Sequence, residues 1–187
     1  MIDMATPRPA GPSASPSSDA DWSADLTARD GYRFHVRPAA PADEPALAEF
    51  FTHVSSEDLR FRFLSTVRKV GHDQLTALVT IDHHRVENFL AIESGTGLVI
   101  ATAMIAADET RTNAEVAVAI RSDFKHRGIS WTLVEHVVQF ARSEGIATLE
   151  SIESRDNHQA IELERDMGWS ASPCPGDPTL IVLRMVL

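Results

Sequence analysis

One segment of the 187-residue chain, AEVAVAIRSDFKHRGIS over residues 114–130, combines the residues best suited to chemistry. Alternating apolar residues up to Arg121 predict a strand, a short basic loop follows, and a helix begins near Gly128. A helix start directs free backbone N–H groups and the positive end of the helix dipole to one point, which favours a phosphate. Gly128 has no Cβ and lets the backbone approach such a ligand. A single glycine before a helix is also typical of an ordinary turn.

Glu115 is the acidic side chain on this predicted strand, and it shares a strand face with the small residues Ala117 and Ala119. A lysine ammonium, with a pKa of about 10.4, must lose a proton before it can attack a carbonyl carbon. Glu115 is therefore our candidate general base. The alternative is an exposed carboxylate on an ordinary polar strand face.

Other elements must position these residues. Alternation predicts strands near residues 32–37, 88–93, 98–106, 148–152 and 180–186, and periodicity of three to four predicts helices near 47–54, 55–64, 72–79, 128–145 and 157–167. The stretch from Ser94 to Gly97 reads as a hairpin turn. This order of strands and helices predicts a three-layer α/β domain over residues 31–187.

Residues 1–30 are rich in proline, serine and alanine and show no apolar periodicity. Such a segment cannot bury enough surface to offset its ordering entropy, so we expect a disordered leader. Docking of Trp22 and Leu26 on the domain is the alternative.

Composition excludes several classes of protein. The net charge of −10 argues against nucleic acid as a partner, and it suits either a cationic partner or solubility alone. No apolar run approaches the roughly 20 residues of a membrane span, and no secretion signal is present, so we expect a cytoplasmic protein that does not bind membranes. The single cysteine, Cys174, excludes an internal disulfide framework.

The loop KHRGIS at residues 125–130 resembles the Q/R-x-x-G-x-G/A pyrophosphate loop of the GNAT superfamily of N-acetyltransferases. Asn157, Ala160, Leu163 and the pair Gly168-Trp169 resemble the family's N-x-x-A-x-x-L…G-F pattern. The resemblance implies the GNAT fold, with a mixed, mostly antiparallel sheet, and acetyl-CoA as acyl donor. It also matches Glu115 to the glutamate of the family's A-E-V/F-A-V pattern. The implied cofactor-binding residues are Val118, Ala119, Ile120, Lys125, His126, Arg127, Gly128, Ile129, Ser130 and Asn157.

The sequence departs from the family at two loop positions and at one catalytic position. Lys125 replaces Gln or Arg, and Ser130 replaces Gly or Ala. Many members place a tyrosine general acid on the last helix, where this chain has Glu164. We therefore assign no general acid, because a coenzyme A thiol with a pKa of about 8.5 can leave as thiolate or take a proton from water.

The first third of the chain resembles the Pat-type bacterial protein lysine acetyltransferases. The resemblance lies in Arg37-Pro38, in SSEDLRFRF at residues 55–63, and in Thr80-Ile81-Asp82. It implies a lysine on another protein as acceptor, with AMP-forming acyl-CoA synthetases among the targets. Two alternatives stay open: an acetyltransferase for small amines, and a non-catalytic acyl-CoA-binding module.

We predict no metal site. Asp82, His83 and His84 are adjacent, but neighbours in sequence rarely face one ion, so a polar loop near the acceptor entrance is the favoured interpretation. Cys174 has no partner base implied by the sequence, and we assign it no nucleophilic role.

Overall fold

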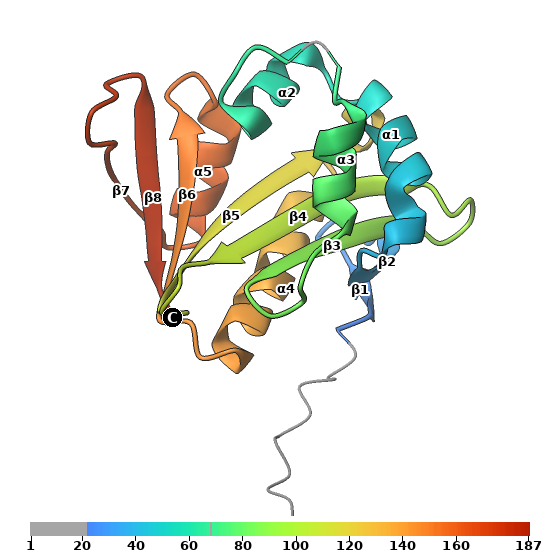
Figure 1. Ribbon diagram of the computed structural model, residues 1–187, viewed down its shortest axis with the longest axis horizontal. Coiled ribbons are helices and arrows are strands. Elements are labelled where there is room, and N and C mark those ends of the chain that lie inside the picture. Colours follow the sequence, from blue (N-terminus) through green and yellow to red (C-terminus); the bar gives the residue numbers. More distant parts are fainter. Residues whose placement is uncertain (1–21, 68) are drawn as a thin grey trace, which may run out of the picture.

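The computed structural model describes residues 22–67 and 69–187, and within them the chain forms one mixed sheet with helices on both faces (Figure 1). The strand order is β1-β2-β3-β4-β5-β6-β8-β7, and every neighbouring pair is antiparallel except β5 and β6. The predicted fold class is therefore confirmed.

The strands are β1 (Ala24–Thr27), β2 (Arg33–Pro38), β3 (Val86–Glu93), β4 (Val99–Ala107), β5 (Asn113–Ile120), β6 (Thr148–Ser154), β7 (Ser170–Pro173) and β8 (Leu180–Val186). The helices are α1 (Glu44–Thr52), α2 (Ser56–Phe63), α3 (His72–Val79), α4 (Ile129–Ser143) and α5 (His158–Asp166), with short 3-10 turns at Pro41–Asp43 and Ser122–Phe124. Sequence patterns predicted all five helices but missed the short edge strands β1 and β7.

Two apolar clusters fill the space between the layers. One joins α4 and α5 to one face of the sheet and includes Leu133 and Val137 of α4 and Leu149 of β6, all fully buried. The other joins α1, α2 and α3 to the opposite face through residues such as Phe50 and Leu90. Helices with one apolar stripe must bury that stripe against the sheet, which gives the three layers.

The expectation of a disordered leader up to residue 30 is wrong for residues 22–30, and its remainder lies outside the described residues. β1 pairs with β2 from Ala24 opposite Val36 to Thr27 opposite Arg33. Trp22 contacts His136 and Phe140 of α4 edge-on, with ring centroids 5.7 and 5.3 Å apart. The domain therefore begins at or before Trp22. Alternation over only four residues gave too little pattern to reveal β1.

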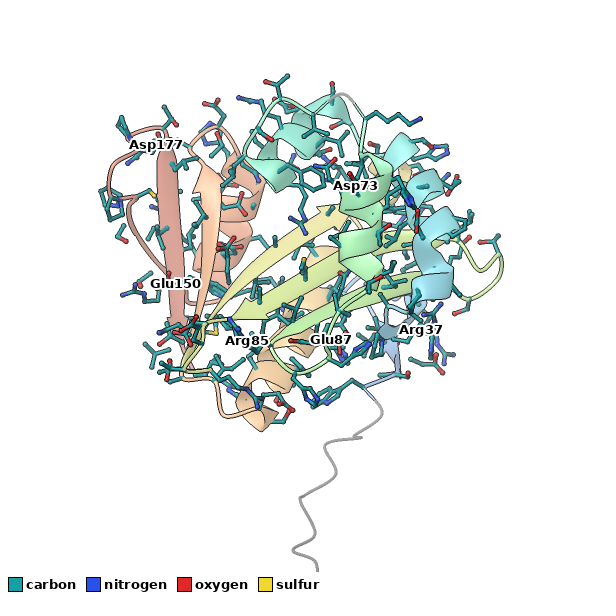
Figure 2. All side chains as sticks on the ribbon, viewed as in Figure 1. Arg37, Asp73, Arg85, Glu87, Glu150 and Asp177 are labelled. Atoms are coloured by element: carbon teal, nitrogen blue, oxygen red, sulfur yellow. The ribbon has the colours of Figure 1, made fainter. Side chains whose placement is uncertain are left out.

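The centre of the sheet opens between its two parallel strands. β5 and β6 pair only from Asn113 to Glu115, opposite residues 148–150, and then diverge (Figure 1). Glu150, which lies opposite Glu115 in this register, sits toward the end where the strands converge (Figure 2). Beyond Glu115, every second residue of β5 directs its backbone N–H and C=O away from β4 and toward the opening. These groups are available to a ligand with amide groups of its own.

Candidate active site

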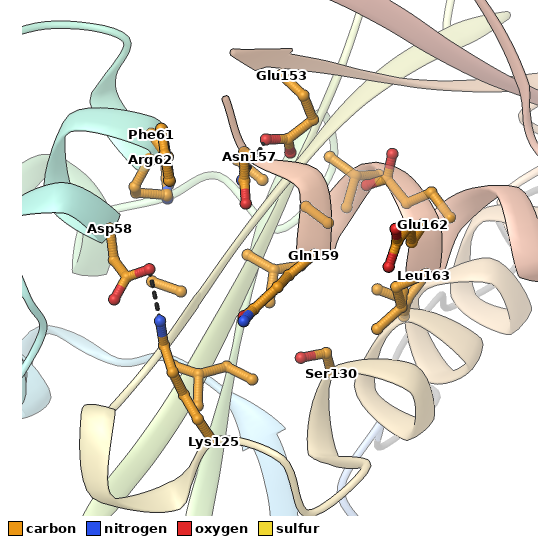
Figure 3. Close-up of a pocket in the computed structure, with 18 of the residues that line it drawn as sticks. Asp58, Phe61, Arg62, Lys125, Ser130, Glu153, Asn157, Gln159, Glu162 and Leu163 are labelled. Carbon is orange, nitrogen blue, oxygen red and sulfur yellow. Dashed lines mark hydrogen bonds and ion pairs between the residues drawn. The ribbon is translucent and has the colours of Figure 1, made fainter. Parts of the chain in front are cut away.

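The main cavity of the described residues occupies this opening and has a volume of about 430 Å³ (Figure 3). It is lined by β5 from Glu115 to Ile120, by the loop before α4, by one face of α5, and by α2. Ile152 and Glu153 of β6 complete the wall. Most ligand pockets combine apolar walls with a few convergent polar groups, and this cavity has that character.

The predicted phosphate loop forms one end of the cavity. His126 and Gly128 both have positive φ, 63° and 76°, so the chain turns sharply before α4 begins at Ile129. No side chain caps this helix. Its first N–H groups, together with the Ser130 side chain that lines the cavity, are therefore available to an anion.

The structure places eight of the ten predicted cofactor residues in the lining. They are Val118, Ala119, Ile120, Lys125, His126, Gly128, Ser130 and Asn157. The other two point elsewhere. The Arg127 guanidinium lies over the rings of Tyr32 and Phe124, at 5.0 and 5.1 Å, and Ile129 is 1% exposed in the core. Neither residue is part of the lining, because adjacent residues of a tight turn face different ways.

Gly128 is needed for two reasons, of which the sequence suggested one. A Cβ at this position would stand 3.2 Å from the backbone nitrogen of Arg29, just after β1. The positive φ also disfavours a side chain. Arg29 in turn places its guanidinium 3.4 Å from the ring centre of Trp131 on α4. The segment after β1 therefore packs directly against the phosphate loop.

Glu115, the candidate base, lies at the point where β5 and β6 separate, and its side chain is exposed to the cavity. Arg62 of α2 lines the same cavity. Burial lowers the pKa of Arg62, while the carboxylates of Glu115 and Glu153 act in the opposite direction. The Arg62 Nε is buried without a hydrogen-bond partner among the described residues, and Nη2 contacts only the Met104 sulfur, at 3.6 Å. Arg62 therefore adds a positive charge to this part of the pocket.

Two carboxyl groups lie on the β6 and α5 wall. Burial and the neighbouring Glu164 raise the pKa of Glu153 to about 8, although the Asn157 amide donates to it at 2.7 Å. Burial raises the pKa of Glu164 to about 7, and the Ser151 hydroxyl donates to its Oε2 at 2.5 Å. Both groups therefore hold protons in a pH range where ordinary carboxyl groups have lost them.

Helix α2 spans the cavity between its two sides. Lys125 Nζ of the phosphate loop contacts Asp58 Oδ1 at 2.7 Å, as the dashed line in Figure 3 shows. On the other side, Arg60 lies 3.6 Å from Asp156, in the loop before α5. Lys125, which we expected to bind phosphate, is thus already paired with a carboxylate.

Sequence reasoning missed the lining residues Asp58, Arg62, Glu153 and Gln159. For Arg62, the sequence holds a weak indication that it faces inward. It lies three residues after the buried Leu59 and therefore shares the same side of α2. Nothing in the pattern around Glu153 distinguished it from Glu150 on the same strand. Glu153 is set apart by its neighbours Asn157 and Glu164, which come close to it only in the folded protein.

The remaining candidates have structural explanations. The Asp82 carboxylate accepts hydrogen bonds from the backbone N–H groups of His84, Arg85 and Val86, which lowers its pKa to about 2. No group of three metal-ligating side chains occurs in residues 22–67 and 69–187. None of the helices in the described part of the chain is long and apolar enough to cross a membrane.

Comparison with known proteins agrees with this geometry. The sequence model described as "Acetyltransferase (GNAT) family" matches residues 49–169. Acetyltransferase PA5475 of Pseudomonas aeruginosa is 26% identical over 160 residues, which cover 84% of this chain and 86% of that protein. The GNAT domain of S. lividans PAT has a TM-score of 0.82 at 24% identity, covering 93% of this chain and 100% of that one. A cAMP-binding acyltransferase from Mycobacterium smegmatis has a TM-score of 0.61 at 22% identity, covering 88% of this chain and 46% of that one.

Proposed function

Because this chain belongs to the GNAT acetyltransferase family and is an acetyl-CoA-dependent N-acetyltransferase, we propose that its acceptor is a lysine side chain of another protein. The observation that carries the proposal is the exposed carboxyl group of Glu115, which faces the cavity where β5 and β6 diverge. An acidic group at the entrance of a protein with a net charge of −10 attracts a cationic acceptor such as an ammonium group.

The chain's own residues would divide the work along the cavity. The N–H groups at the start of α4 and the Ser130 side chain would hold the pyrophosphate of acetyl-CoA. The free backbone groups of β5 beyond Glu115 would bind the amides of its pantetheine arm. Glu115 would take a proton from the lysine ammonium, so that the neutral amine can attack the thioester carbonyl.

For the target we propose AMP-forming acyl-CoA synthetases, whose activity would be lost on acetylation of a catalytic lysine. Support comes from the Pat-type sequence features of α2, SSEDLRFRF, which lie beside the cavity. The overall similarity to the GNAT domain of S. lividans PAT agrees with this choice.

The experiment is to incubate the full chain with radiolabelled acetyl-CoA and a panel of purified acyl-CoA synthetases, with spermine and free lysine as small amines. Label on a lysine of a synthetase, with loss of synthetase activity, is the expected result. Label confined to the small amines would replace the proposal with a small-amine acetyltransferase. Acetyl-CoA binding without transfer to any acceptor would indicate a binding module.

Glu115→Gln keeps the side-chain size but removes the proton acceptor, and it gives the matched test of mechanism. We expect unchanged acetyl-CoA binding and a loss of turnover of about 100-fold or more, the usual scale for a general base. Glu109→Gln makes the same change of charge at an exposed site outside the cavity and should turn over like the wild type. Equal turnover of the Glu115→Gln variant and the wild type at neutral pH would assign the base role to another group or to water.

A further inference from the structure

We propose that Glu153 is the general acid of this enzyme, giving its proton to the coenzyme A sulfur as the thioester breaks, and that Glu164 is the positioning residue that keeps this proton in place. The proposal rests on the acetyltransferase function argued above. It assigns a role to the half-buried Glu153 and the buried Glu164, neither of which takes part in proton removal by Glu115.

Location is the first argument. Glu153 and Glu164 both line the cavity, on the wall opposite β5 (Figure 3 labels Glu153). The Asn157 amide, on a residue expected to contact the cofactor, donates to Glu153 Oε2 at 2.7 Å. Arg62 of α2 lines the same cavity and adds a positive charge on the side that faces Glu153.

Loss of contact with water and, after it, the charge of Glu164 raise the pKa of Glu153 and keep it protonated. Glu164, on α5, is 7% exposed and raises the pKa of Glu153 by like-charge repulsion. The Asn157 amide and, from α2, Arg62 act against this, and no ion pair joins Arg62 to either carboxyl group within the described residues. Lys125 is occupied by Asp58 at 2.7 Å. The lining also includes the ionisable groups Glu115, His126, Glu162 and Asp166.

Chemical matching is the second argument. A general acid works best when its pKa is close to that of the group it protonates and to the working pH. The pKa of Glu153, raised to about 8, lies close to the thiol value of about 8.5. Glu164 is less suited as donor, because it is only 7% exposed, whereas Glu153 is half-buried.

The protons balance over one turnover. Glu115 takes the first proton from the lysine ammonium, the amine forms the C–N bond, and the C–S bond breaks. The thiolate takes the proton of Glu153, and the nitrogen loses its second proton as the amide forms. One of the two ammonium protons restores Glu153 and the other leaves to solvent, so the products are amide, thiol and one free proton.

The test measures kcat from pH 6 to pH 10 with acetyl-CoA and poly-L-lysine, and divides the wild-type value by that of each variant so that titration of the acceptor cancels. For Glu153→Gln we expect a ratio of at least about 10 below pH 7, falling toward 1 above about pH 9 as Glu153 loses its proton. Glu164→Gln removes the like charge and should lower the pKa of Glu153. In this variant, the pH above which proton donation by Glu153 is lost should therefore shift to a lower value. Glu109→Gln should give a ratio near 1 throughout.

Two measurements without turnover separate this proposal from the proposed function. Infrared spectra at pH 6.5 should show protonated carboxyl bands, of which one is lost in Glu153→Gln and another, that of Glu164, is lost in Glu164→Gln. Wild-type stability should fall between about pH 5 and 8 relative to that variant, because a raised folded pKa makes the folded state bind more protons than the unfolded state. A pH-independent kcat ratio for Glu153→Gln would overturn the acid assignment, whereas no wild-type transfer to any acceptor would overturn the proposed function and the acid role with it.

Discussion

The ion pair between Lys125 and Asp58 should compete with acetyl-CoA for the lysine. Lys125 Nζ lies 2.7 Å from Asp58 Oδ1, and the two side chains are 28% and 22% exposed. An anion that binds at the start of α4 must draw Lys125 away from this partner or share it. Asp58→Asn removes the competing charge and keeps the side-chain size, and the α2 cap survives because the Asp58 backbone N–H donates to Ser55 Oγ.

The expected change in Kd follows from how exposed the ion pair is to solvent. Ion pairs open to solvent contribute about 0.2–1 kcal/mol, and both side chains of this pair are largely covered, so we take the upper end, about 1 kcal/mol. That energy no longer opposes binding in Asp58→Asn, and the Kd for acetyl-CoA should fall about fivefold. Lys125→Gln should instead raise the Kd about tenfold, because a charged hydrogen bond to phosphate is lost.

The assay is calorimetric titration of the folded full chain with acetyl-CoA at low salt. Glu57→Gln is the matched control, since it removes the same charge from the exposed side of α2. Combining Asp58→Asn with Lys125→Gln should abolish the gain, because no competition remains. Tighter binding by Glu57→Gln to the same degree, or weaker binding by Asp58→Asn, would refute the competition and indicate that Asp58 holds Lys125 ready for phosphate.

Three further predictions concern the loop, β1 and the base. Gly128→Ala should lower the melting temperature as well as acetyl-CoA affinity, since its Cβ would stand 3.2 Å from the Arg29 backbone, whereas Ser130→Gly should keep binding within a few fold by calorimetry. Deleting residues 1–28 should lower the melting temperature by several degrees more than deleting 1–21, because it removes β1 and Trp22; equal melting temperatures would show that β1 contributes little. In Glu115→Gln, turnover should recover at alkaline pH, where free amine becomes common, and a variant that stays inactive there would point to a role beyond proton removal.

The sequence was most informative where function requires a local pattern. Strand, basic loop and helix follow one another within residues 113–143, and the phosphate loop between them depends on a glycine and on the helix start. These features are set by neighbouring residues, so they could be read without the fold. Glu115 could be placed for the same reason, since alternation along β5 fixes its face.

The direction of side chains in the loop could not be predicted. Lys125 and Arg127 carry the same charge and lie two residues apart, yet of the two only Lys125 lines the cavity. The reason is the positive φ of His126, which turns the chain between them, and of Gly128, which turns it again directly afterwards. Positive φ at a histidine has no clear sequence signature. Charge alone therefore could not tell which of the two side chains lines the cavity.

The wall opposite β5 depends on the point where β5 and β6 part, and no pattern within either strand marks that point. Pairing with β5 stops at Glu150, so Glu153, which still pairs with Ile181 of β8, borders the cavity on its other side. Packing of α5 then buries Glu164 and partly covers Glu153, which raises the pKa of both carboxyl groups toward neutral pH or above. The same divergence thus creates room for the cofactor and separates a carboxylate on β5 from a carboxylic acid on β6. A base and an acid of one residue type can work together only because they lie on different sides of that opening.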